Sequence, residues 1–212
     1  MNDGPLKLPR LYALVDRGML DLREIGVAEF ARALRDAGVT LVQYRDKSGA
    51  PQEILRAAAE IAGVFAGVDA MLILNDRADL AVLAGWGVHV GHLDLEPADA
   101  RRVVGVGRVV GVSTHSDEQV IAADASAADY IAVGPVFATS TKTDAEPVIG
   151  LEGVRRARSL TWKPLVAIGG ITWENARNVI DAGADSVAVI GGLLVMGERP
   201  GKLAEDFLEI LR

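Results

Sequence analysis

Residues 163–192 read KPLVAIGGITWENARNVIDAGADSVAVIGG. Two short apolar runs, at 163–168 and 185–190, each end at a glycine doublet, and a helix-like segment separates them. Short runs rich in valine and isoleucine are typical of strands that are buried on both faces of a parallel sheet. The stretch therefore predicts a strand–helix–strand unit with parallel strands.

The same alternation recurs along the whole chain. Strand candidates lie at 10–15, 39–44, 70–74, 87–90, 108–113, 129–133, 163–168 and 185–190. Helix candidates lie at 25–36, 51–66, 77–85, 97–104, 116–126, 150–159, 172–182 and 201–211. Eight such units predict an α/β protein with a closed (β/α)8 TIM barrel, built by residues 1–212 as a single compact domain with a flexible tail over 1–9. A doubly wound open sheet is the alternative, but the first strand lacks the glycine-rich turn of that fold.

Composition disfavours several classes of protein. The net charge of −7 and the pI of about 5.0 argue against binding to nucleic acid or to an anionic membrane surface. The absence of cysteine removes disulfides and thiolate chemistry, and it is compatible with a cytoplasmic location. We see no signal sequence and no apolar stretch long enough to span a membrane. We expect the partners to be small-molecule substrates, and the sequence leaves open whether the chain forms a homo-oligomer.

Polar residues follow the second predicted strand, in the stretch QYRDK. Gln43, Arg45 and Lys47 alternate along the chain, so they project to one side of an extended segment. In a barrel the carboxyl ends of the strands meet at one rim, which is where active sites are built. One amide and two cations at this rim suit a ligand that carries phosphate and hydrogen-bonding edges. A solvated strand end is the alternative interpretation.

Two carboxylates follow the third and fourth predicted strands. Asn75 and Asp76 directly follow the third strand, and Asp94 lies in the stretch VHVGHLDL, after the fourth strand. Mg²⁺ typically binds one or two carboxylates and takes its other ligands from water and substrate phosphate. We therefore predict that Asp76 and Asp94 hold Mg²⁺, while helix capping by Asp76 is the alternative.

Small hydroxyl residues and glycine doublets follow the remaining strands. Ser113, Thr114 and His115 follow the fifth strand, and the sixth runs into GPVFATSTK, which contains Thr139, Thr141 and Lys142. The doublets Gly169-Gly170 and Gly191-Gly192 follow the seventh and eighth strands. Barrels often hold a phosphate between these last two loops, where glycine lets backbone N–H groups approach the anion. Together these loops predict a site for phosphorylated ligands.

These motifs resemble those of the thiamine-phosphate synthase family. The resemblance runs from LYALVD at 11–16 to SVAVI at 186–190 and includes QYRDK, LND, VHVG with Asp94, GVSTH, GPVFATSTK and AIGGI. It implies a transferase of thiamine biosynthesis that joins 4-amino-5-hydroxymethyl-2-methylpyrimidine diphosphate to 4-methyl-5-(2-phosphonooxyethyl)thiazole. It also implies a Mg²⁺-assisted dissociative reaction, in which diphosphate leaves before the thiazole nitrogen attacks.

The resemblance also implies a role for each matching residue. The pyrimidine diphosphate would contact Gln43, Arg45, Lys47, Asn75, Ser113 and Lys142. The thiazole phosphate would contact Thr139, Thr141, Gly169, Gly170, Ile190 and Gly191. The metal would be held by Asp76 and Asp94. Arg45, Lys47, Ser113 and Lys142 are the residues expected to act on the leaving diphosphate and are our candidate catalytic residues.

The sequence departs from the family pattern at three positions and leaves two other functions open. His92 and Leu93 replace a glutamine and an acidic residue before Asp94, and Gly191 replaces a serine. A sister family of similar fold, the thiazole tautomerases, uses a histidine near a similar segment, so proton transfer by His115 is one alternative. A non-catalytic binding protein is the other. A metal site built from the three histidines is less favoured than the carboxylate pair.

Overall fold

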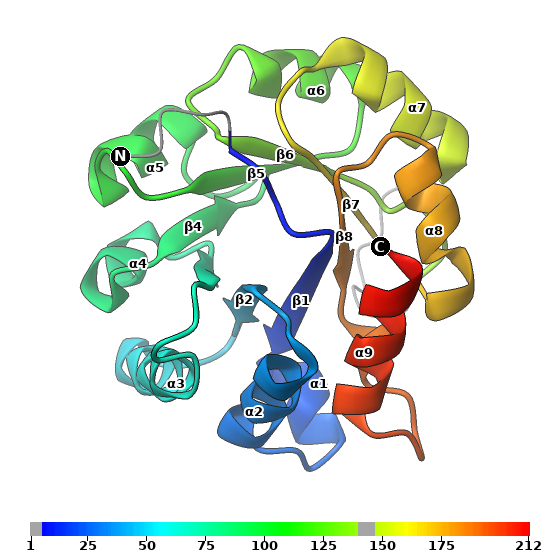
Figure 1. The fold of residues 1–212 in the computed structure, drawn as a ribbon. Helices are drawn as coiled ribbons and strands as arrows, with labels where there is room; N and C mark the ends of the chain where they lie inside the picture. The colour runs from blue at the N-terminus through cyan, green and yellow to red at the C-terminus, as the bar shows by residue number, and fades with distance from the viewer. Residues whose placement is uncertain (1–5, 140–146) are drawn as a thin grey trace.

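A computed structural model describes residues 6–139 and 147–212. Eight parallel strands pair in chain order, and β8 returns to β1 to close a barrel. The strands are β1 Leu11–Asp16, β2 Leu41–Arg45, β3 Met71–Asn75, β4 Gly87–Val90, β5 Val110–Thr114, β6 Tyr130–Val133, β7 Leu165–Ile168 and β8 Ser186–Val189. The helices around them are α1 Arg17–Leu22, α2 Val27–Ala37, α3 Pro51–Val64, α4 Ala78–Ala84, α5 Pro97–Val104, α6 Asp117–Asp124, α7 Gly150–Leu160, α8 Trp173–Asp181 and α9 Pro200–Ile210 (Figure 1). The predicted TIM barrel is confirmed.

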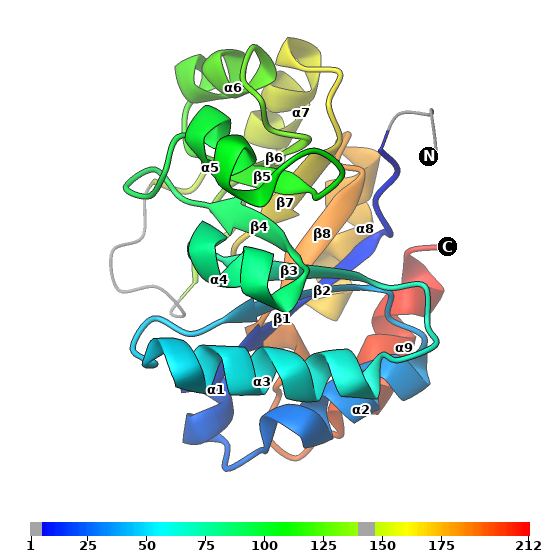
Figure 2. The ribbon, with the colours of Figure 1, turned by 90° about the vertical axis from the view of Figure 1, so that its left-hand side faces the viewer.

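The barrel has two apolar layers. The larger layer lies between the strands and the outer ring of helices, and includes Phe30, Leu34 and Phe207. The smaller one fills the barrel interior with side chains such as Leu41, Ile73 and Val166, and is sealed in part by apolar residues ahead of β1. Figure 2 shows the strands from the side, with the helices outside them. Within residues 6–139 and 147–212, no helix is both long and apolar enough to cross a membrane.

Two short helices were not predicted from the sequence. Helix α1 follows β1 directly because the Asp16 carboxylate accepts a hydrogen bond from Met19 N at 3.0 Å and caps the first turn. A single 3₁₀ turn, η1 Gly191–Leu193, follows β8. Helices α2 and α4 end at Gly38 and Gly85, and both glycines adopt left-handed backbone conformations.

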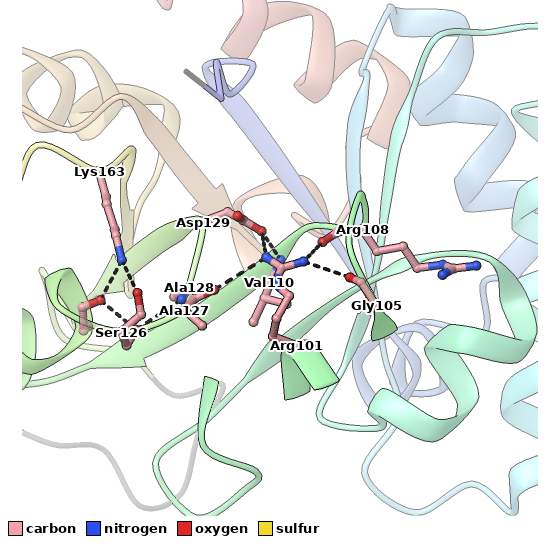
Figure 3. A network of polar contacts seen from close by, with 10 residues as sticks. Arg101, Gly105, Arg108, Val110, Ser126, Ala127, Ala128, Asp129 and Lys163 are labelled. Carbon is pink, nitrogen blue, oxygen red and sulfur yellow. Dashed lines mark hydrogen bonds and ion pairs between the residues drawn. The ribbon is translucent and has the colours of Figure 1, made fainter. Parts of the chain in front are cut away.

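An arginine–aspartate clasp fastens two strands where they begin. Asp129, directly before β6, accepts a hydrogen bond from Val110 N of β5 at 2.7 Å and pairs with Arg101 of α5 (Figure 3). Arg101 also donates to backbone carbonyl groups of the loops before these strands. A second clasp of the same design, around Asp185, joins the start of β7 to β8. The clasps fix the end of the barrel opposite the predicted site.

Replacing Asp129 by alanine is expected to lower the free energy of unfolding by about 1–3 kcal/mol, because Val110 N–H loses its acceptor and Arg101 its partner. Urea denaturation followed by tryptophan fluorescence measures this change. Asp99→Ala is the matched control, since Asp99 pairs with Arg102 on the exposed surface and its loss is expected to cost less than about 0.5 kcal/mol. Equal effects of both variants would contradict a structural role for the clasp.

Candidate active site

A pocket opens inside the barrel at the carboxyl ends of the strands. Its wall combines apolar side chains with a few convergent polar groups, which is the usual composition of a site for a small organic ligand. The apolar members are Leu14, Ala132, Val166, Ile168, Ala188 and Ile190. The polar and aromatic members are Tyr12, Gln43, Arg45, Asn75, His89, Ser113, Thr114 and His115. Gln43, Arg45, Asn75, Ser113 and Ile190, which we predicted from the sequence, thus share one pocket.

The polar residues of β2 are held by partners on neighbouring strands. Gln43 points into the barrel, where its Nε2 donates to the Tyr12 hydroxyl at 2.7 Å. Arg45, at the end of β2, forms an ion pair with buried Asp16 at the end of β1. Sequence analysis missed Asp16, although its place directly after the first strand is a signal of the same kind as Asn75 after the third. Asp16 fixes the Arg45 guanidinium at the pocket wall.

Asn75 carries a polar atom without a partner. Its Nδ2 is buried and forms no hydrogen bond within the part of the chain that the structure describes. Leaving a buried N–H group unpaired costs about 1–3 kcal/mol, so such atoms in binding pockets point to a ligand. Asn75 is therefore available to donate to a molecule in the pocket.

Asp76, directly after Asn75, lies at the centre of a charged cluster. Its backbone adopts φ +62°, and its N–H donates to His89 O at 2.7 Å, which turns the chain at the rim. Lys47 Nζ donates to the Asp76 carboxylate at 2.5 Å. Burial raises the pKa of Asp76, the hydrogen bond from Lys47 opposes this rise, and the Asp94 carboxyl, within hydrogen-bonding reach, adds to it. Two carboxyl groups and one cation thus meet at one point.

The donor set of this cluster fits Mg²⁺. Asp94 is exposed, and its Oδ2 accepts a hydrogen bond from Gly91 N at 2.8 Å, which orients the carboxylate. Two hard oxygen donors that lie this close to each other favour a small divalent cation. Among the described residues, no group of three or more histidine or acidic side chains could hold a metal ion. A metal here would therefore depend on water and ligand phosphate for its remaining ligands.

The three histidines occupy separate environments. His89 is buried in the barrel, where Nε2 lies 2.9 Å from Ser113 Oγ. His92 is exposed in the loop after β4. His115 Nδ1 lies 2.6 Å from the Gly134 carbonyl oxygen, to which it donates. This bond leaves His115 Nε2 as its remaining ring nitrogen and holds the ring against the strand end.

The glycine doublet after β7 supports the neighbouring loop. Gly169 and Gly170 have φ of +102° and +63°, and Val136 N and Phe137 N donate to Ile168 O and Gly169 O at 2.9 and 3.0 Å. A Cβ at Gly170 would lie 2.4 Å from Ala138 O. The doublet is therefore needed for close contact with the loop that carries Thr139.

The other predicted residues of these loops have different positions. Thr139 is half-buried at the end of the first described segment, whereas Thr141 and Lys142 lie outside the described residues. Gly191 opens the 3₁₀ turn η1 directly after Ile190. Because β7 and β8 pair in the barrel, the loops that follow them are neighbours at the rim.

Comparisons with known proteins identify the family of this chain. The family model described as "Thiamine monophosphate synthase" matches residues 11–193. A thiamine-phosphate synthase of Koribacter versatilis is 53% identical over 97% of both chains, and one of Chloroflexus aurantiacus is 40% identical over 87% of this chain and 85% of the relative. The solved thiamine phosphate pyrophosphorylase of Pyrococcus furiosus superposes with a TM-score of 0.84 at 30% identity over 95% of both chains. These relatives give the tautomerase alternative no support. The chain belongs to the thiamine monophosphate synthase family and is a thiamine-phosphate synthase.

Proposed function

We propose that this enzyme joins 4-amino-5-hydroxymethyl-2-methylpyrimidine diphosphate to 4-methyl-5-(2-phosphonooxyethyl)thiazole, releasing diphosphate, with Mg²⁺ as cofactor. The observation that carries this proposal is the unpaired Asn75 Nδ2 in the pocket, directly before Asp76 of the carboxylate cluster. A flat aromatic ring suits the apolar wall, and a charged tail suits the adjoining cluster. The identity of the substrates comes from the family.

The polar wall of the pocket supports binding of a pyrimidine. Gln43 and Asn75 offer amide groups to the ring nitrogens and the amino substituent. Leu14, Val166 and Ile168 offer apolar contact to the ring faces. The ring would thus be oriented by a few hydrogen bonds while its methylene carbon faces the rim.

The cations at the rim support loss of diphosphate. Arg45 is fixed by Asp16, whereas Lys47 is exposed and can transfer its hydrogen bonds from Asp76 to a phosphate oxygen. Asp76 and Asp94 would hold Mg²⁺, which supplies positive charge to the leaving diphosphate. Ser113, at the pocket wall, would donate a hydrogen bond from its hydroxyl group to the leaving diphosphate. We propose that Lys142 donates to the same diphosphate from its ammonium group.

The reaction needs no protein nucleophile and no proton transfer. The bond between the methylene carbon and the diphosphate oxygen breaks, and both electrons leave with diphosphate. The thiazole nitrogen then gives its lone pair to the methylene carbon and becomes the thiazolium nitrogen of thiamine phosphate. Preorganised charges that favour the departing anion are the main catalytic contribution expected of such a site.

The loops after β6, β7 and β8 support a site for the thiazole phosphate. Thr139 and Thr141 would donate hydroxyl hydrogens to this phosphate, and the Gly169-Gly170 turn and the Ile190-Gly191 backbone would line it. The adjacency of β7 and β8 brings these loops together. Both reacting groups would then lie over the same pocket.

Incubation of the purified enzyme with both substrates and Mg²⁺ is expected to yield thiamine phosphate, measured by thiochrome fluorescence. Removal of the metal with EDTA is expected to lower the rate by at least about 100-fold, because the diphosphate then leaves without the positive charge of the metal. Addition of excess Mg²⁺ should restore it. Absence of product with both substrates and metal, or an undiminished rate in EDTA, would contradict the proposal.

A further inference from the structure

Five side chains form a continuous line of hydrogen bonds through the barrel interior. Gln43 Nε2 donates to the Tyr12 hydroxyl at 2.7 Å, and the Tyr12 and Tyr130 hydroxyl groups lie 2.9 Å apart. The Tyr130 hydroxyl lies 2.9 Å from His89 Nδ1, and His89 Nε2 lies 2.9 Å from Ser113 Oγ. We call Gln43, Tyr12, Tyr130, His89 and Ser113 the interior relay. It joins the two pocket residues that would contact opposite ends of the pyrimidine diphosphate.

The middle of the relay is buried and tightly packed. The Tyr130 ring stacks on the His89 ring at a centroid distance of 5.5 Å and meets the Tyr12 ring edge-on at 6.1 Å. Burial raises the pKa of both tyrosines above the usual value, so both phenols keep their proton at neutral pH. Each phenol therefore has a single hydrogen to donate, which links the bonds on its two sides.

The orientation of the Gln43 amide determines the direction of the other bonds. Because Nε2 donates to the Tyr12 oxygen, the Tyr12 hydrogen is left to donate to Tyr130. Tyr130 then donates to His89 Nδ1, so the proton of a neutral His89 lies on Nε2. His89 Nε2 donates to Ser113 Oγ, and the Ser113 hydrogen is left for a ligand in the pocket.

Rotation of the amide by half a turn reverses the relay. With Gln43 Oε1 against Tyr12, each hydroxyl donates in the opposite sense and His89 carries its proton on Nδ1. Ser113 then uses its hydrogen on His89 Nε2 and no longer offers it to the ligand. In the observed orientation Gln43 Oε1 accepts no hydrogen bond from any described residue, so it is available to a ligand.

We propose that the three middle residues of the interior relay are positioning residues, which link recognition of the pyrimidine at Gln43 to the orientation of the Ser113 hydroxyl. An amino group on the ligand donates to Gln43 Oε1 and keeps Nε2 on Tyr12. A ring carbonyl in the same place attracts Nε2 instead, reverses the relay and withdraws the Ser113 hydrogen from the diphosphate. The relay would thus select an aminopyrimidine over an oxopyrimidine. This inference rests on the function proposed above.

The first test locates the His89 proton by ¹⁵N NMR of the full-length enzyme labelled at histidine. His89→Gln identifies the signals of this ring. In the ligand-free enzyme the proton is expected on Nε2, and in Tyr130→Phe, which keeps the ring but removes the hydroxyl, a share of the proton is expected on Nδ1. A proton on Nδ1 in the unsubstituted enzyme, or an identical distribution in the variant, would overturn the relay.

The second test compares the affinities for 4-amino-5-hydroxymethyl-2-methylpyrimidine monophosphate and its 4-oxo analogue by calorimetry. We expect Tyr130→Phe to reduce the preference for the amino compound by at least about tenfold, since selectivity of this kind depends on correctly paired buried groups. Tyr12→Phe interrupts the same relay, and it replaces Tyr130→Phe in this experiment if Tyr130→Phe does not fold. An unchanged preference would overturn the proposal.

Tyr44→Phe is the matched control. Tyr44 is a buried tyrosine of the same sheet, but its hydroxyl donates to Asp46 outside the barrel interior, so its removal should leave the preference unchanged. The two tests measure ligand binding and the position of the His89 proton, and neither requires catalytic turnover. Failure of the unsubstituted enzyme to make thiamine phosphate would therefore contradict the proposed function alone, whereas an unchanged preference in an active variant would contradict the relay alone.

Discussion

Replacement of Asp94 by alanine is expected to lower kcat/KM for thiamine phosphate formation by at least about 100-fold, because removal of one preorganised electrostatic group from an active site commonly costs this much. Asp76, the other carboxylate of the cluster, already receives a hydrogen bond from Lys47. A cation would then be held by a single carboxylate that is partly neutralised. The Mg²⁺ concentration that gives half the maximal rate is therefore expected to rise together with the loss of activity.

Glu96→Ala is the matched control for Asp94→Ala. Glu96 is an exposed carboxylate two residues further along the same loop, and its side chain does not cap α5. Its removal changes the net charge by the same amount and should leave both the rate and the metal requirement unchanged. Circular dichroism establishes that both variants fold. If Asp94→Ala retained normal activity and metal dependence, Asp94 would not be part of the metal site.

Much of the fold could be predicted because it depends on local patterns. Short valine-rich runs, helix-like segments between them and glycine stops are visible in the sequence, and their eightfold alternation leaves few topologies. Helix α1 could not be found in this way, since it has six residues and depends mainly on its cap by Asp16. Such a short helix has almost no periodicity to detect.

The candidate site was predictable only at the strand ends. Polar residues that directly follow an apolar strand, such as Asn75 and Asp76, can be recognised in the sequence. The interior relay was not predictable, because Tyr12 and Tyr130 lie within apolar strands and are 118 positions apart. Their pairing follows from the alternation of side chains and the register of the whole barrel, which no single segment encodes. The Gly169-Gly170 doublet was predicted as a phosphate turn, yet its clearest structural role is contact with the preceding loop.

Gly111 of β5 is the position where one added methyl group is expected to have the largest effect on the interior relay. A Cβ at Gly111 would lie 2.0 Å from Tyr130 Cζ and 2.4 Å from the Tyr130 hydroxyl oxygen. Tyr130 is completely buried, so the ring cannot move into solvent and must displace His89 or Tyr12. Gly111→Ala is therefore expected to lower the free energy of unfolding by about 1–3 kcal/mol, the usual cost of overpacking a core.

The same variant is expected to lose selectivity for the aminopyrimidine, as Tyr130→Phe does, because the displaced hydroxyl no longer connects the two halves of the relay. Gly63→Ala in helix α3 is the matched control: its Cβ would meet nothing within 4 Å, and we expect a gain of up to about 1 kcal/mol in the free energy of unfolding.

The double variant Gly111→Ala/Tyr130→Ala tests whether contact with the Tyr130 ring, rather than general strain in β5, causes the loss of stability. If the clash with the ring is the cause, Gly111→Ala lowers the free energy of unfolding only slightly once the ring is absent. Urea denaturation then shows that the effects of the two substitutions are strongly non-additive. If the two effects were additive, the loss of stability in Gly111→Ala would come from another part of β5.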